Sequence, residues 1–261
     1  MRAALAAASK DVRMRSNFAR RAGLAMAALA ATASMAEAGV TRLEIVRREI
    51  VMDGKAFGAA GPYEKLVGRV HFTLDPAAPP NRGIVDLALA PKNGAGLVEF
   101  SADVYLLKPV DPARGNGRLF YEAGNRGTKR ILPVFQNGAS SEDPTTAADF
   151  GTGALMRQGF TLLWMGWQWD VPAGRMRMAI PIATEAGKTI TGLVRGNFIP
   201  GAHATEASVA DRGHEAYPVV DPSSATNVMY VRTLPSDPPA VVPRATWRFS
   251  GPGLYPWTST R

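Results

Sequence analysis

Two short stretches carry the residue types best suited to chemistry. The first is Gly124-Asn-Arg-Gly127, which follows an apolar run ending at Tyr121, and the second is Trp167-Gln-Trp-Asp170, at the end of another apolar run. A glycine-rich loop at a strand end can present backbone N–H groups to a developing oxyanion. The alternative is a plain turn, in which both glycines serve positive φ angles. We predict three oxyanion-loop residues, Asn125, Arg126 and Gly127. We also predict four residues that line a pocket, Trp167, Gln168, Trp169 and Asp170.

The two stretches meet only if the elements before them lie side by side. Leu119–Tyr121 predicts a strand, residues 147–159 predict a helix ended by Gly159, and residues 160–170 predict a second strand. Strand, loop, helix and strand form a βαβ unit, which implies a parallel pair covered by helix. In open sheets of this kind, ligands bind beyond the carboxyl ends of the strands. We therefore expect both stretches to belong to one site.

The usual sequence signatures of catalysis are missing. There is no Gly-x-Ser-x-Gly, Ser-x-x-Lys, His-Glu-x-x-His or Walker A sequence. Gly151-Thr-Gly153 resembles the start of a dinucleotide motif, but Met156 occupies the third glycine's place, which favours helix capping or close packing. The absence of cysteine excludes disulfides and thiolate catalysis. Catalytic residues stay unassigned, and no cofactor is predicted.

Aromatic and imidazole side chains leave a second possibility. Trp164, Trp167 and Trp169 invite stacking on sugar rings, although large aromatic side chains more often fill cores, and core packing is favoured. One polar loop is crowded with possible metal ligands, but their spacing matches no known ligand pattern, so no metal site is predicted. These residues are His203, Glu206, Asp211, His214 and Glu215.

The rest of the chain is dominated by strand patterns. Alternating residues predict strands over 41–53, 66–74, 84–90 and 98–106, the clearest having one polar and one apolar face. Beyond Asp170 the pattern predicts a hairpin over 175–195, a loop over 200–224 and a further strand over 227–234. The division is thus a β-rich part (41–110), a βαβ core (119–170) and a hairpin and loop insertion (175–234). With only one crossover visible, both a mostly-strand α+β protein and a shortened α/β domain fit.

The N-terminus has the features of an export signal. Arginines precede an apolar stretch over 24–31, and Ala36-Glu-Ala38 fits a cleavage site, so we expect residues 1–38 to be a signal peptide and the product to be periplasmic or secreted. Translation from Met14 would give a tidier signal, and the alternative is an alanine-rich amphipathic helix. The apolar stretch is too short for a permanent membrane anchor. Six basic and two acidic residues here account for +4 of the net charge of +8, and no basic–aromatic run predicts nucleic-acid binding.

Three segments carry a resemblance to a known family. Residues 61–75 (GPYEKLVGRVHFTLD), 121–127 (YEAGNRG) and 166–170 (GWQWD) resemble the N-terminal part of bacterial alpha/beta hydrolase domain-containing proteins, with similarity over about residues 40–249. The resemblance implies an incomplete α/β-hydrolase-like sheet. It also implies hydrolysis of a small-molecule carboxylic ester by a serine, histidine and carboxylate. Asn125, Arg126 and Gly127 then lie in the loop that lends an N–H to the oxyanion hole.

This chain departs from the family near Gly251, before any Gly-x-Ser-x-Gly sequence. Because members of the family are longer, we expect a truncated serine hydrolase that is inactive as this chain. The alternative, from another functional class, is an exported β-rich module that binds a glycan or a metal ion through its tryptophans or its His/Glu loop.

Overall fold

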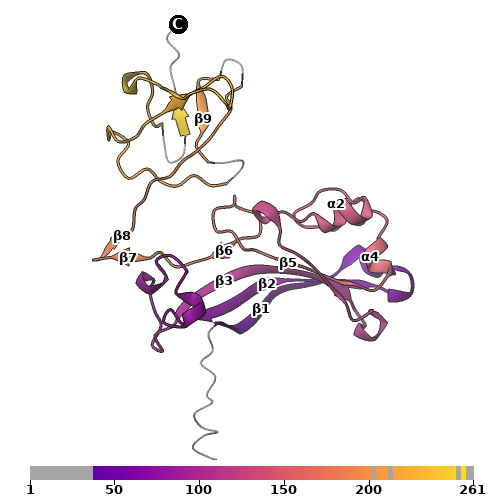
Figure 1. Cartoon of the computed structure of the whole chain (residues 1–261). Coiled ribbons are helices and arrows are strands. Elements are labelled where there is room, and N and C mark those ends of the chain that lie inside the picture. Colours follow the sequence, from indigo (N-terminus) through magenta and orange to yellow (C-terminus); the bar gives the residue numbers. More distant parts are fainter. Residues whose placement is uncertain (1–37, 202–203, 211–213, 251–253, 257–261) are drawn as a thin grey trace, which may run out of the picture. The chain divides into compact units, whose positions relative to one another are not determined.

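The main element of the structure is one mixed sheet (Figure 1). The computed structural model describes residues 38–201, 204–210, 214–250 and 254–256, so the predicted signal peptide lies, but for Ala38, outside the described residues. The strand order is β1-β2-β3-β5-β4, and a short β6 also pairs with β3. The strands are β1 (Ala38–Ile50), β2 (Tyr63–Leu74), β3 (Val98–Pro109), β4 (Leu119–Glu122), β5 (Thr161–Met165) and β6 (Met178–Ala179).

The first three strands form an antiparallel meander. β2 and β3 pair without interruption over their full length, whereas β1 carries two irregularities in its register with β2. Gly68 lies opposite this bent edge, where an added Cβ would collide with the carbonyl oxygen of Glu44. The predicted strand over 84–90 is wrong: Asp86 has a φ of 58°, and residues Leu87–Leu89 form a 3-10 turn, η4.

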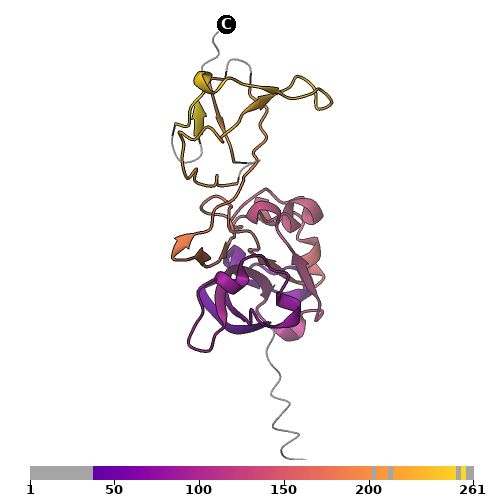
Figure 2. The same cartoon turned by 60° about the vertical axis from the view of Figure 1, so that its left-hand side comes forward.

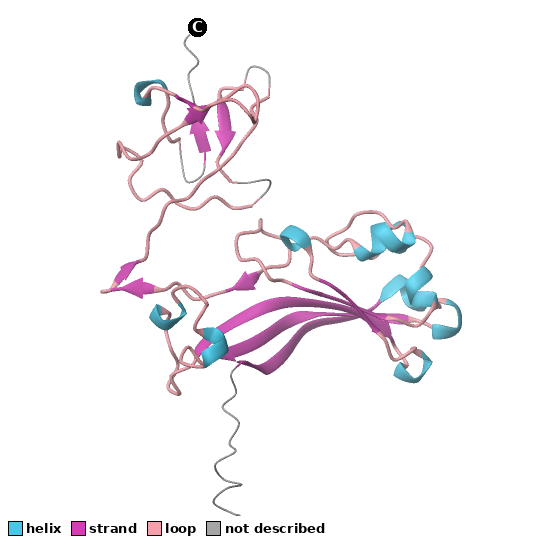
Figure 3. Cartoon of the chain, viewed as in Figure 1, coloured by secondary structure: helices cyan, strands magenta, loops and turns pink. Residues whose placement is uncertain are grey.

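The predicted βαβ unit is confirmed. β4 and β5 are parallel neighbours, and the chain between them contains three short helices, α2 (Ile131–Gln136), α3 (Ala147–Phe150) and α4 (Ala154–Arg157) (Figure 3). The single helix predicted over 147–159 is wrong because the chain reverses between α3 and α4. Gly151 and Gly153 have φ angles of 52° and 64°, which an α-helix cannot contain. α2 was not predicted, because it contains Pro133 and proline usually breaks a helix. Pro133 lies in the first turn of α2, where proline is tolerated.

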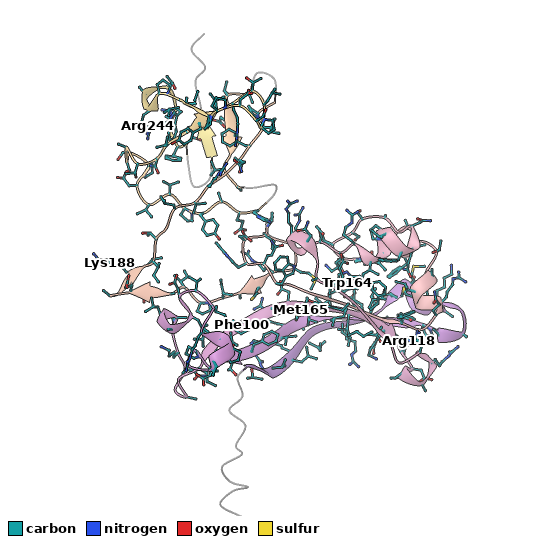
Figure 4. The ribbon with its side chains drawn as sticks, in the orientation of Figure 1. Phe100, Arg118, Trp164, Met165, Lys188 and Arg244 are labelled. Carbon is teal, nitrogen blue, oxygen red and sulfur yellow. The ribbon has the colours of Figure 1, made fainter. Side chains whose placement is uncertain are left out.

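The helices cover one face of the sheet. Figure 2 shows the helices on one side of the strands. Trp164, labelled in Figure 4, lies in a single core with Tyr63, Tyr105, Leu162 and apolar side chains of all three helices. Trp164 is fully buried there, which confirms core packing for this tryptophan. The helical side chains in this core are Ile131, Leu132, Phe150, Leu155 and Met156.

The opposite face is apolar but only partly covered. The register places Leu43, Val70, Val104, Leu163 and Tyr121 on it, one from each main strand. η4 packs over one end, at Leu74 and Val98. At both edges of the sheet the face is open: Leu43 is 57% exposed and Tyr121 is 45% exposed. Among the described residues, the outer edges of β1 and β4 pair with no strand.

The remaining chain holds small pairs of strands. The expected hairpin is present but much shorter than predicted, since only β7 (Thr184–Glu185) and β8 (Lys188–Thr189) pair, around Ala186 and Gly187 with positive φ. The further pairs are β10 (Tyr230–Val231) with β11 (Ala240–Val241) and β9 (Glu206–Ser208) with β12 (Leu254–Pro256). The chain is thus a mixed α/β protein made mainly of sheet. The other 3-10 turns are η1 (Val51–Gly54), η2 (Gly58–Ala60), η3 (Pro79–Asn81), η5 (Pro112–Arg114), η6 (Asn125–Gly127) and η7 (Arg244–Thr246).

Candidate functional site

The carboxylate of Glu122 fixes the end of β4. Its Oε2 accepts hydrogen bonds from the backbone N–H groups of Arg130 and Ile131, at 2.8 and 2.9 Å, and from the indole N–H of Trp164 at 2.6 Å. Trp164 is the partner of Glu122 in the β4–β5 register. One ionised acceptor therefore closes the loop 123–130 onto the start of α2 and onto β5, through charge-assisted hydrogen bonds.

The loop that Glu122 closes has an unusual backbone. Arg126 has a φ of 54° and Gly127 a φ of 70°, two left-handed residues in succession. Glycine adopts this conformation freely, but a side chain such as arginine rarely does, and strained backbone of this kind clusters at functional sites. A Cβ on Gly127 would also collide with the backbone of Met176, whose N–H donates to the Gly127 carbonyl at 3.1 Å.

The segment after β5 packs directly against this loop. Trp167 donates its indole N–H to the carbonyl of Gly124 at 2.9 Å, and the backbone N–H of Arg126 donates to Oε1 of Gln168 at 2.7 Å. Gly166 begins this segment, where the Arg177 backbone leaves no room for a side chain. The structure therefore brings together the loop 124–127 and Trp167 and Gln168, as the parallel arrangement required.

Two of the three predicted oxyanion-loop residues already use their N–H groups. The N–H of Arg126 is held by Gln168, and the N–H of Gly127 donates to the Gly124 carbonyl at 3.3 Å. Asn125 is exposed between Gly124 and Arg126. Their role toward an oxyanion stays a prediction, and it requires Gln168 to yield its place to the substrate.

The other two pocket-lining candidates face a segment that sequence reasoning did not connect with them. Trp169 packs edge-on against Tyr217, with ring centroids 5.1 Å apart. Oδ2 of Asp170 lies 3.6 Å from Nδ1 of His214, and the carbonyl of Asp170 accepts the backbone N–H of Glu215 at 2.6 Å. Residues 214–217 therefore border the site.

His214 is the functional candidate that the sequence placed only in a crowded polar loop. Its Nε2 lies 3.3 Å from Nε2 of Gln168, so the same glutamine touches both the loop after β4 and this histidine. No sequence pattern indicated that residue 214 contacts residue 168. The only sequence feature that pointed to His214 was its place beside Glu215 in a stretch without periodicity. Of the crowded loop, His203 and Asp211 lie outside the described residues.

Among the described residues, no three His, Asp or Glu side chains gather in a way that suits a metal ion. None of the helices described is long and apolar enough to cross a bilayer.

The predictions of glycan binding, of the substrate and of the absence of nucleic-acid partners stay predictions. Trp167, which is 47% exposed, is the described tryptophan most open for stacking.

The guanidinium of Arg126 is a further unusual feature of the loop. Its Nε is buried, and no protein atom accepts a hydrogen bond from it. A buried donor without a partner costs about 1–3 kcal/mol. Together with the positive φ, this makes Arg126 the most strained residue of the candidate site.

A hollow of about 400 Å³ adjoins the site at the free edge of β4. It lies between the strand and α2 and is mainly apolar. Its lining includes Phe120, Tyr121, Glu122, Ile131 and Phe135. A second hollow, of about 270 Å³, lies at the start of β4 and β5, around Arg118 and Gly159, and is therefore remote from the candidate site.

A second buried polar cluster lies under the covered face of the sheet. Asp143 accepts hydrogen bonds from Lys65 at 2.9 Å, Arg47 at 2.8 Å and Tyr105 at 3.1 Å, and Lys65 also pairs with Glu49 at 2.8 Å. Lys65 is only 1% exposed, so the sequence-based expectation of a polar surface face on this strand is wrong here. The ion pairs allow a lysine in that position.

These contacts set the acidity of the groups involved. Burial alone raises the pKa of Asp143, but the hydrogen bonds from Arg47 and Lys65 outweigh it and lower the pKa from 3.8 to about 2. Burial raises the pKa of Tyr105 and lowers that of Lys129, whose ammonium lies 4.7 Å from the centre of the Tyr105 ring. The donors around Asp143 all have acceptors, which marks this cluster as structural.

Comparisons with protein-family models, with curated proteins and with solved structures found no match to this chain. The features of this chain that bear on function are therefore its sequence segments 61–75, 121–127 and 166–170 and the geometry at the ends of β4 and β5.

Proposed function

We propose that this chain forms the opening portion of a serine-hydrolase sheet of the α/β-hydrolase class, acting on carboxylic esters. The observation that carries the proposal is the junction between Arg126 and Gln168. It joins the loop after β4 to the loop after β5, at the carboxyl ends of two parallel strands, where ligands bind in open sheets of this kind.

The chemistry follows from the resemblance. A serine attacks the ester carbonyl, a histidine takes its proton, and a carboxylate orients the histidine. The loop 124–127 supplies a backbone N–H toward the developing oxyanion. The strained φ of Arg126 supports this role, because strained backbone clusters at functional sites.

The open parts of the sheet also support the proposal. The outer edge of β4 and the apolar face around Tyr121 and Leu43 are suited to further strands and a further layer. No Gly-x-Ser-x-Gly sequence lies within the 261 residues. In this proposal the nucleophile is supplied by polypeptide that pairs at this edge, and we expect the chain alone to be inactive.

A fusion tests the proposal. The chain is joined to the nucleophile-bearing portion of an alpha/beta hydrolase domain-containing protein and exposed to a fluorophosphonate probe and p-nitrophenyl esters. We expect labelling and turnover by the fusion, no activity from either half, and no labelling after the elbow serine is replaced by alanine. Robust ester turnover by the 261-residue chain alone would overturn the proposal.

Substitutions in the fusion locate the oxyanion loop. Gly127→Ala forces a Cβ into the backbone of Met176 and should lower kcat by about 100-fold, the usual effect of losing one oxyanion donor. Gly192→Ala is the matched control, because a Cβ there meets open space at an ordinary φ. Equal activity of both variants would remove loop 124–127 from the site.

A further inference from the structure

Gln168 holds two partners at once, and the two require opposite ends of its amide. Its Oε1 accepts the N–H of Arg126 at 2.7 Å, so its NH2 group is the end that faces Nε2 of His214 at 3.3 Å. An amide NH2 only donates. Nε2 of His214 must therefore carry a lone pair, which places the proton of the neutral ring on Nδ1, on the side of Asp170.

Protonation of His214 makes this arrangement impossible. The imidazolium has an N–H at both nitrogens, so Nε2 becomes a donor that faces another donor. The amide of Gln168 relieves the conflict by turning its oxygen toward His214. Its NH2 group then faces the N–H of Arg126, which loses its acceptor.

We propose that His214 is a pH-sensitive switch that controls, through Gln168, whether the backbone N–H of Arg126 is held or free. The inference deepens the proposed function, since the N–H concerned belongs to the predicted oxyanion loop. In the neutral state Gln168 occupies that N–H. In the protonated state the N–H is released and free to meet an oxyanion.

Charged groups surround His214. Histidine is the side chain that ordinarily changes charge between pH 5 and 8. The carboxylate of Asp170 faces Nδ1 of His214. Glu215 is the next residue in the chain, and its carboxylate is paired with Arg177 at 3.3 Å. Arg177 also donates to the Trp169 carbonyl at 2.6 Å, so this cation lies beside the same segment.

Isotope-labelled full-length chain provides the test. Amide exchange at Arg126 is measured by NMR at pH 8 and pH 5 and divided by the intrinsic exchange rate at each pH. We expect the protection of this amide to fall about tenfold at the lower pH. We also expect its ¹⁵N shift to titrate with the same midpoint as the ring carbons of His214.

Three variants separate the switch from a general effect of acid. His214→Leu should abolish the pH dependence at Arg126, and His71→Gln, which removes a histidine bound to Glu44 and Arg42 elsewhere on the sheet, should preserve it. Gln168→Glu should keep Arg126 protected at pH 5, because a carboxylate accepts from both partners at once.

Two results would overturn the inference. One is protection at Arg126 that does not change with pH in the unmodified chain, and the other is a pH dependence that survives His214→Leu. The coincidence of the two titration midpoints needs no variant, so the test holds if a variant fails to fold. The readout involves no catalysis, so its failure is distinct from failure of the ester-hydrolase proposal.

Discussion

Two partly buried polar junctions join distant parts of this chain, and they are built differently. At the first, Asp143 accepts hydrogen bonds from Lys65, Arg47 and Tyr105. At the second, Gln168 links the N–H of Arg126 to His214, next to a left-handed arginine with a buried, unpartnered Nε. The saturated junction maintains the fold. The strained one, which includes a histidine, lies where the parallel strands end.

The largest expected difference between the junctions is in stability. Asp143→Ala should lower the free energy of unfolding by about 3 kcal/mol, because it leaves Lys65 buried with Glu49 alone and the Tyr105 hydroxyl without its acceptor. Urea denaturation measures this. Glu185→Ala, on the exposed β7–β8 hairpin, is the control and should change stability by less than about 0.5 kcal/mol. A loss below about 1 kcal/mol for Asp143→Ala would contradict the structural role of its junction.

Two glutamines sharpen the comparison. Gln136 is 1% exposed, accepts the N–H of Leu155 at 2.8 Å and donates to the Phe150 carbonyl at 3.2 Å. Gln136→Leu should lower the free energy of unfolding by about 2 kcal/mol, since it leaves buried backbone groups at the start of α4 without hydrogen-bond partners. Gln168→Leu should cost about 1 kcal/mol or less, because its junction is less buried. Thermal unfolding of both proteins decides; a greater loss at Gln168 would reverse the assignment of roles.

The pH dependence of stability tests the acidity of Asp143. Its folded pKa, about 2, lies below its ordinary value of 3.8, so its contribution is complete above about pH 4 and is lost as the pH falls toward 2. Because the carboxylate is partly exposed, we expect a loss of about 1–2 kcal/mol rather than the full value of the shift. Denaturant titrations at pH 4.5 and pH 2 should show this loss in the unmodified chain and a smaller one in Asp143→Asn. Equal losses in both would place the acid sensitivity elsewhere.

The smallest expected effect concerns the strain at Arg126. Arg126→Gly removes the steric cost of a positive φ and a buried unpaired donor, so it should raise stability by up to about 1 kcal/mol. Asn137→Gly is the reference, because asparagine tolerates its φ of 54° and should gain little. Differential scanning calorimetry compares them. A destabilised Arg126→Gly chain would mean that the arginine supports the loop rather than burdening it.

Much of the sheet was predictable because its strands have regular patterns. The alternation at Leu66–Leu74 and Val98–Leu106 predicted β2 and β3, and the apolar runs over 119–121 and 160–170 predicted the parallel pair, although β5 ends at Met165. The helical region was harder to predict, since three helices of four to six residues give too few turns for a 3.6-residue period. Gly151 and Gly153 separate α3 from α4, whereas the sequence pattern continues across both glycines and predicts one helix.

The candidate site was predictable only in part, for a related reason. Residues 124–127 and 167–170 follow strands, so parallel topology alone brought them together. His214 reaches Gln168 across 46 residues, from a segment without periodicity, and only tertiary structure shows the contact. The burial of Lys65 was equally hidden, because its carboxylate partners at 49 and 143 come from other segments.

The central claim is that the ends of β4 and β5 form one site, joined by the N–H of Arg126 and the amide oxygen of Gln168. A hydrogen-bond scalar coupling between the Arg126 amide nitrogen and the side-chain carbonyl carbon of Gln168 measures that bond directly, in the full-length chain at pH 8. We predict a resolved coupling that disappears in Gln168→Leu. A protected Arg126 amide coupled to a different carbonyl, or no coupling in a folded chain, would contradict it.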